Sequence, residues 1–292
     1  MAPTPSRDLQ DAASPSVRAG QNNMTRPACP NLLACAFVAA LAASLHTNAN
    51  AESIARAQYE APTQRYGHFA LGHPHEYARL AVTTDAGRRL VFDLPDNEVF
   101  EDLTPRLVKL AAHEPTELLT IVSNRQTGAR LVLFRLKGDH LVLGGESQAV
   151  GTPMRWLNPV GVVDLDGDGQ AEIASVTTPH IGGTLKVYQR TEGQLVEVAA
   201  LGGFSNHVYG SPELGLSAHQ TLAGQTRLLV PDNSRRHLRI IEFSLGRLTE
   251  TGRCSMPAPV TGAVTPLSGS KVSVGLATGR HEVVSNACLA HR

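Results

Sequence analysis

The chain is poor in aromatic residues and cysteine, and neither sign of charge is in excess. Its 292 residues include one tryptophan, five tyrosines, seven phenylalanines and four cysteines. Basic and acidic residues are equal in number, with 26 of each, and no run of lysine or arginine is present to contact phosphate groups. This balance argues against a nucleic-acid partner.

Helical periodicity and the sequence signatures of common enzymes are also missing. From Tyr66 onward, no segment has a helical pattern of apolar residues longer than two turns. No Gly-x-Ser-x-Gly elbow, phosphate-binding loop or dinucleotide-binding fingerprint occurs in its required strand and helix context. We therefore expect an all-β fold, and we assign no catalytic residue.

A signal peptide is predicted at residues 24–51. A short basic start at 24–26 precedes an apolar run at 32–45, which is too short to span a membrane. The sequence Ala-Asn-Ala at 49–51 has the small-x-small pattern that a signal peptidase cuts, here before Glu52. We therefore expect a periplasmic or secreted protein without a stable membrane span after cleavage. The alternative is an uncleaved anchoring helix.

Residues 1–23 are polar and rich in proline and serine, and they are interpreted as a disordered or misannotated leader. Cys35 resembles a lipidation site, but it lies at the start of the apolar run, where such a site should lie at the end. After cleavage only Cys254 and Cys288 remain, and an oxidising compartment favours one disulfide between them. Two free thiols are the alternative.

Short strands rich in leucine and β-branched residues recur in pairs along the rest of the chain. Each pair is separated by a turn, and a Gly-x-Leu turn with a third strand follows several of them. The pairs are 80–82 with 90–92, 118–122 with 131–134, 173–176 with 185–188, 228–230 with 238–243, and 272–276 with 283–284. Their spacing of roughly 40 to 55 residues is typical of propeller blades.

We therefore expect residues 66–292 to form a β-propeller of about five to seven blades, partly degenerate, after a linker at 52–65. A β-sandwich would also contain regularly spaced strands. A sandwich, however, gives no reason for the same strand–turn–strand unit to repeat.

An acidic loop between two of these strands has the spacing of a calcium site. Asp164, Asp166, Asp168 and Glu172 occupy loop positions one, three, five and nine, and Gln170 at position seven offers a backbone carbonyl. Calcium takes six to eight oxygen ligands in a forgiving geometry, which such a loop can supply. We expect a structural Ca²⁺ ion here; the alternative is a solvated turn.

The acidic loop, the Glu-Ile-Ala sequence at 172–174 and the following Gly-x-Leu-x-Val-Tyr strand together resemble FG-GAP/VCBS repeats. These repeats are blades of integrin-like β-propellers. The resemblance implies that Asp164, Asp166, Asp168, Gln170 and Glu172 hold calcium within one blade. It also implies an extracellular or periplasmic binding or adhesion module, without implying a reaction.

Histidines and two loop segments are further candidates. His68, His73 and His75, with Glu76, could bind zinc or another transition metal, although surface histidines are the simpler interpretation. Trp156, Asn158, Asn206 and His207 lie in polar–aromatic segments outside the strands and are possible ligand-binding residues; Trp156 could equally plug a space between blades.

We expect a calcium-stabilised binding or interaction module whose partner is an unknown protein or glycan. The alternative is a periplasmic hydrolase or lyase with a site in the central channel, which requires acid–base residues from several blades to converge. We expect His68, His73, His75, His180 and His207 to lie apart. Two of them within about 4 Å of each other, or beside a channel with a carboxylate, would favour the enzyme.

Overall fold

A computed structural model describes residues 52–290, and these contain 19 β-strands and one short 3-10 helix, Ser285–Cys288. The predicted leader and signal peptide lie outside the described residues. The described residues all belong to one unit of the chain. The all-β prediction is confirmed for the part of the chain that the structure describes.

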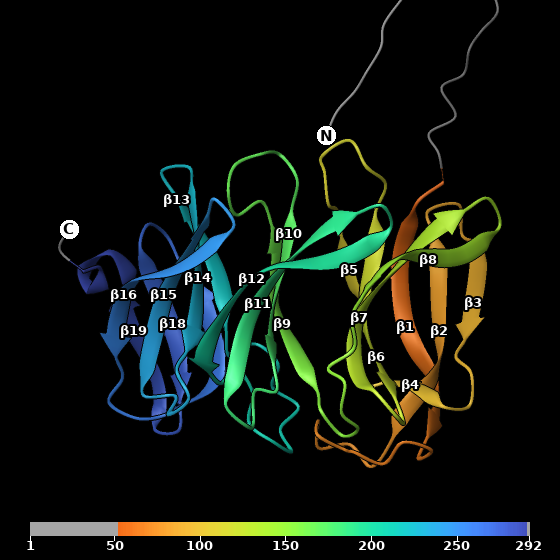
Figure 1. The fold of residues 1–292 in the computed structure, drawn as a ribbon, viewed down its shortest axis with the longest axis horizontal. Coiled ribbons are helices and arrows are strands. Elements are labelled where there is room, and N and C mark those ends of the chain that lie inside the picture. The colour runs from red at the N-terminus through yellow and green to blue at the C-terminus, as the bar shows by residue number, and fades with distance from the viewer. Residues whose placement is uncertain (1–51, 291–292) are drawn as a thin grey trace, which may run out of the picture. The chain divides into compact units, whose positions relative to one another are not determined.

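The strands form five antiparallel groups that follow one another in chain order (Figure 1). The first three groups are joined at two narrow points into one hydrogen-bonded sheet, through Tyr77 with Phe100 and through two residue pairs between β8 and β12. The groups are β1 (Ile54–Thr63), β2 (Glu76–Thr84) and β3 (Arg89–Asp93); β4 (Glu98–Phe100), β5 (Arg106–Val108), β6 (Glu117–Asn124), β7 (Gly128–Lys137) and β8 (His140–Ser147); β9 (Leu157–Val163), β10 (Glu172–Thr177), β11 (Gly183–Thr191) and β12 (Gln194–Phe204); β13 (Ala218–Leu222), β14 (Gln225–Pro231), β15 (His237–Ser244) and β16 (Arg247–Ser255); and β17 (Val260–Pro266), β18 (Lys271–Leu276) and β19 (Gly279–Val284).

All five strand pairs predicted from the sequence are antiparallel neighbours in the structure. They are β2 with β3, β6 with β7, β10 with β11, β14 with β15, and β18 with β19. The predicted third strands are β8, β12 and β16, each paired with the strand before it. The local repeat of strand, turn and strand therefore gives the hairpins correctly.

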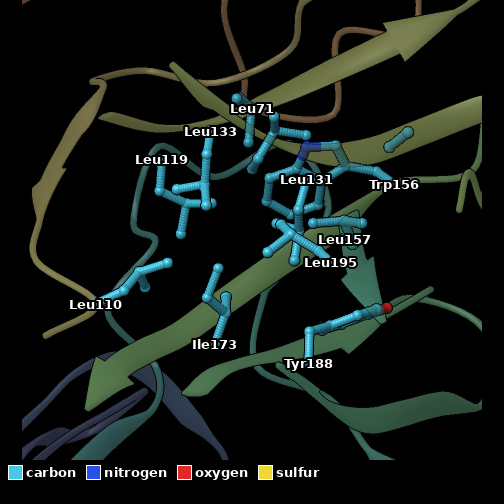
Figure 2. Packing of buried hydrophobic residues seen from close by; sticks show 12 residues of the cluster. Leu71, Leu110, Leu119, Leu131, Leu133, Trp156, Leu157, Ile173, Tyr188 and Leu195 are labelled. Carbon is cyan, nitrogen blue, oxygen red and sulfur yellow. The ribbon is translucent and has the colours of Figure 1, made fainter. Parts of the chain in front are cut away.

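The groups pack face to face, with one apolar cluster between each consecutive pair. Figure 2 shows the cluster between the second and third groups, where Leu119 and Leu133 meet Ile173 and Trp156. β6 and β10 are buried along almost their whole length because each is covered on both faces. Each fully buried leucine contributes about 1.5–3 kcal/mol, so stability arises between the groups rather than within one.

The outer faces of the first and last groups are mostly polar. On the first, an ion pair of 2.6 Å joins Arg79 to Asp93, and on the last, Arg280 donates a hydrogen bond of 3.0 Å to Ser273. Terminal repeats of stacked proteins need such polar faces. Residues 52–290 show no closed barrel or propeller ring, so the propeller arrangement and its blade count stay predictions.

The linker expected at 52–65 is wrong, because most of this segment is the strand β1. Eight residues of β1 pair with β2, and Ile54 and Tyr59 are buried against the first apolar cluster. Alanine and charged residues fill most other positions, so the alternation of apolar side chains is faint. The pairing is supplied by β2 rather than by strand propensity in β1.

Candidate functional site

The acidic loop connects β9 to β10 and winds around the side chain of Asp164. The carboxylate of Asp164 accepts the backbone N–H groups of Gly167 at 2.7 Å and Gly169 at 2.9 Å. Both glycines have a left-handed φ, of 85° and 87°, which permits this tight winding. Carboxylate oxygens of Asp164, Asp166 and Glu172 lie within 4.8 Å of one another. The fold thus brings together three of the four predicted carboxylates.

Asp168 and Gln170 are not part of this group of three. Asp168 instead accepts the backbone N–H of Gln170 through Oδ1, at 2.7 Å. Their assignment as calcium ligands stays a prediction.

The group fits a hard cation in its chemistry. Glu172 is fully buried, and its carboxylate accepts hydrogen bonds from the backbone of Leu165 at 2.8 Å and the amide of Gln189 at 3.1 Å. Burial raises the pKa of Glu172, and the charges of Asp166 and Asp168 raise it further. A buried carboxylate beside other carboxylates is costly unless a cation compensates it. Oxygen ligands of this kind suit calcium.

A cleft of about 440 Å³ lies beside the acidic loop. Asp164 and Asp166 line one side, and residues of the fourth strand group, including Thr226 and Ser244, line the other. The acidic loop therefore faces open space on one side.

Three loops, after β8, β10 and β12, converge elsewhere, and they bring His180 and His207 into contact. Nε2 of His180 lies 2.8 Å from Nδ1 of His207, and Nε2 of His207 lies 2.9 Å from the carbonyl oxygen of Ser211. The ring of Trp156 packs against both histidines, with centroid distances of 6.0 and 4.8 Å. Burial lowers the pKa of each histidine to about 4. The expectation that these two histidines lie apart is wrong.

His68 joins the same place from the loop between β1 and β2. Its Nδ1 lies 2.6 Å from the carboxylate of Glu101, a buried residue whose pKa is raised by burial. Trp156 donates its indole N–H to the carbonyl oxygen of Glu101 at 2.8 Å. Tyr209 donates its hydroxyl to the carbonyl oxygen of His68 at 2.9 Å, and its ring contacts His68 and His180.

The structure does not bring together the possible transition-metal ligands His68, His73, His75 and Glu76. Glu76 is buried, and it accepts backbone N–H groups from the loop that carries His68. His73 and His75 contact each other, with ring centroids 5.7 Å apart, while His68 bonds to Glu101. Within residues 52–290, the only group of three or more possible metal ligands is the acidic one.

The four residues predicted to bind a ligand do lie together, but three of them are fully buried. Asn158 and Asn206 each donate a side-chain N–H to the backbone carbonyl of the other, both at 3.1 Å. His207 is also fully buried, and Trp156 exposes only 1% of its surface. Asn158, Asn206 and His207 hold the loops together, so any ligand contact falls to Trp156 and the residues around it.

A pocket of about 130 Å³ opens above this buried layer. It is lined by His68, Trp156, His180 and Tyr209 together with Met154, Arg155, Thr178 and Ile181. Three apolar side chains that line it are exposed, namely Met154 (39%), Tyr209 (58%) and Ile181 (61%). We call these three residues the rim. An exposed apolar rim around a pocket is typical of an interaction site.

The backbone beneath the pocket is tight. Thr178 has φ of 55°, an unusual value for a β-branched residue, and its N–H bonds to the carbonyl oxygen of Trp156 at 2.8 Å. Gly72 packs so closely on the loop after β12 that a Cβ there would lie 2.4 Å from the carbonyl oxygen of Gly210. The loop between β1 and β2 is thus fixed against a segment far along the chain.

Cys254 and Cys288 are joined by a disulfide, with Cα atoms 5.1 Å apart. The bond ties β16 to the C-terminal 3-10 helix, away from the pocket residues.

Sequence reasoning did not identify Glu101, Met154, Ile181 or Tyr209. Glu101 follows a three-residue strand and has the appearance of a surface acid in the sequence. The scarcity of aromatic residues is the one signal that could have helped, because the sole tryptophan and Tyr209 gather with the histidines at the pocket.

No protein-family profile matches the chain, and no curated protein matches it in sequence. Among residues 52–290, no helix has the length and apolar character needed to span a membrane.

Proposed function

We propose that the protein is an exported, calcium-stabilised, β-propeller-like module that binds another macromolecule through the rim and its pocket. The observation that carries this proposal is the convergence of Met154, Ile181 and Tyr209 around one pocket. These side chains come from three separate loops, and each is exposed. Loops on a rigid β-scaffold commonly carry binding functions.

Calcium has a structural role in this proposal. The acidic loop and the strands on either side of it resemble the FG-GAP/VCBS pattern, and its buried Glu172 suits a bound cation. The stacking of the strand groups, with polar end faces, is compatible with a partial set of propeller-like blades. The predicted signal peptide supports a periplasmic or secreted location, where the disulfide would be maintained.

A periplasmic enzyme is the second candidate, because the His68–Glu101 pair lies beside the His180–His207 pair at the pocket. Proximity alone would place the enzyme first. However, His207 is buried with both ring nitrogens hydrogen-bonded, and it can only position His180. The low pKa of His180, about 4, makes it a poor proton donor at neutral pH. An exposed apolar rim also suits a macromolecular surface better than a small polar substrate.

Site-specific photo-crosslinking in the producing cells tests the binding function. A benzophenone amino acid at Ile181 should give a discrete adduct. The matched control is Leu245, which is 99% exposed in the turn between β15 and β16. The same adducts at both positions, or none at Ile181, would contradict the proposal.

The enzyme makes a different prediction. Purified wild-type protein would turn over substrates in a hydrolase and lyase panel, and His68→Gln would abolish that turnover. Turnover that depends on His68 would place the enzyme ahead of the binding module.

A further inference from the structure

The hydrogen-bond chain at the pocket fixes which nitrogen of His180 is free. The carbonyl oxygen of Ser211 can only accept, so Nε2 of His207 carries a proton. Both histidines are neutral above about pH 4, so Nδ1 of His207 is an acceptor and takes the N–H of His180 Nε2. Nδ1 of His180 is therefore left as a hydrogen-bond acceptor.

Nδ1 of His180 has no hydrogen-bond partner within residues 52–290. Side-chain atoms in this part of the chain that are both fully buried and unpaired do not include it. It is therefore accessible, and His180 lines the pocket. A ligand that covers Nδ1 on entering the pocket removes its water. If the ligand offers no donor, the unpaired acceptor costs roughly 1–3 kcal/mol.

The size and lining of the pocket determine which chemical group can carry the hydrogen-bond donor. An apolar cavity of roughly 150 Å³ holds one benzene ring, and this pocket measures about 130 Å³. Its walls include Trp156, Tyr209, Met154 and Ile181. One six-membered ring fits, whereas a bicyclic indole is too large.

We propose that the pocket binds the phenol ring of a tyrosine side chain on a partner protein, with the phenol hydroxyl donating a hydrogen bond to Nδ1 of His180. This inference rests on the proposed binding function and names the chemistry of its partner. The rim supplies the reason for a protein rather than a free phenol. Met154 and Ile181 line the pocket but remain exposed, so their outer parts can cover the residues that flank the tyrosine. Tyrosine is also among the residues that dominate binding energy at interfaces.

Trp156 makes this site directly measurable, because it is the sole tryptophan and lines the pocket. We would titrate the mature protein with 4-methylphenol, 4-methylanisole and toluene, and follow tryptophan fluorescence excited at the red edge of its absorption. 4-Methylanisole keeps the ring and the oxygen but has no donor. We expect 4-methylphenol to bind roughly tenfold tighter than either analogue. Equal affinity for the three compounds, or binding of none, would overturn the inference.

Two variants assign the selectivity to His180. His180→Phe keeps an aromatic ring but removes the acceptor, and it should abolish the preference for 4-methylphenol. His207→Gln can still donate to Ser211 and accept from His180, so it should keep the preference. The exposed His140, 76% accessible in its side chain, gives the matched control His140→Phe, which should behave as wild type. If His180→Phe does not fold, the comparison of the three ligands on wild-type protein still decides.

Titration with a tyrosine-containing peptide tests whether the phenol belongs to a protein partner or to a free small molecule. Acetyl-Leu-Tyr-Leu-amide should bind more tightly than 4-methylphenol, and Ile181→Ser should reduce the affinity for the peptide more than the affinity for 4-methylphenol. Equal affinity for peptide and free phenol would overturn the assignment to a protein partner. Adducts at Ile181 without phenol selectivity would leave the binding face in place and refute only the tyrosine pocket.

Discussion

Calcium should stabilise the protein through the acidic loop, and Asp166→Ala should remove this effect. At the limiting separation of 4.8 Å between carboxylate oxygens, two negative charges repel by about 1 kcal/mol in water and by about 3 kcal/mol at an effective dielectric constant near 20. Asp166 is exposed and Glu172 is buried, so each pair falls between these limits. A bound divalent cation reverses this repulsion.

The expected size of the response follows from linkage. An ion that binds only the folded protein adds about 2.7 kcal/mol at a hundredfold excess over its Kd. For a folded unit of this length, that corresponds to a rise in Tm of roughly 5–10 °C. Differential scanning calorimetry with calcium, with magnesium and with a chelator would measure it, and magnesium should have a much smaller effect.

Asp166→Ala should show two changes of opposite direction. It should lose most of the calcium response, and in chelator it should be at least as stable as wild type because one repelling charge is gone. Asp139→Ala is the matched control, since Asp139 is 72% exposed and far from the acidic loop in sequence. A wild-type Tm that ignores both calcium and chelator would refute the reasoning, as would an equal loss of response in the control.

Three further outcomes are expected. Replacing both Cys254 and Cys288 with serine should lower the free energy of unfolding by about 3–4 kcal/mol, because the bond closes a loop with a sequence separation of 34; unchanged urea unfolding would contradict this. The pKa of His207 falls from 6.5 in the unfolded chain to about 4 in the folded protein. The stability that depends on neutral His207 is therefore fully present above pH 6.5 and declines toward pH 4. His207→Gln should reduce that decline by on the order of 2–3 kcal/mol, measured by urea unfolding at several pH values. Gly72→Ala should lower Tm and shift tryptophan emission, because its Cβ would collide with a backbone oxygen. The Cβ of Gly67→Ala meets no atom closer than 3.8 Å, so this variant should show only a smaller loss of Tm, caused by its φ of 77°. Equal effects of the two changes would contradict the close packing of Gly72 on the loop after β12.

The strands and hairpins were predictable because their signals are local. Runs such as 118–122 and 173–176 carry enough β-branched and leucine residues to mark a buried strand, and glycine turns mark the hairpins. β1 was missed because alanine and charged residues weaken its alternation, and β2 provides the pairing. How the sheets are placed relative to one another depends on contacts between distant segments, which no local pattern encodes.

The two candidate sites also differ in how far they could be predicted from the sequence. The acidic loop is contiguous, so its spacing alone identified Asp164, Asp166 and Glu172 as a group. The pocket is assembled from loops far apart in the chain, and its histidines could not be paired from sequence. Glu101 in particular gives no signal until His68 is placed against it.

The hydrogen bond from Tyr209 to the backbone of His68 spans 141 positions of the chain. This sequence separation sets an order of events during synthesis, in which the N-terminal end emerges first. The early strand groups have their neighbours within reach and can fold as they appear, whereas the pocket waits for the segment that contains Tyr209. A chain that stalls or is cut before this point could form the early sheets but would lack the complete pocket.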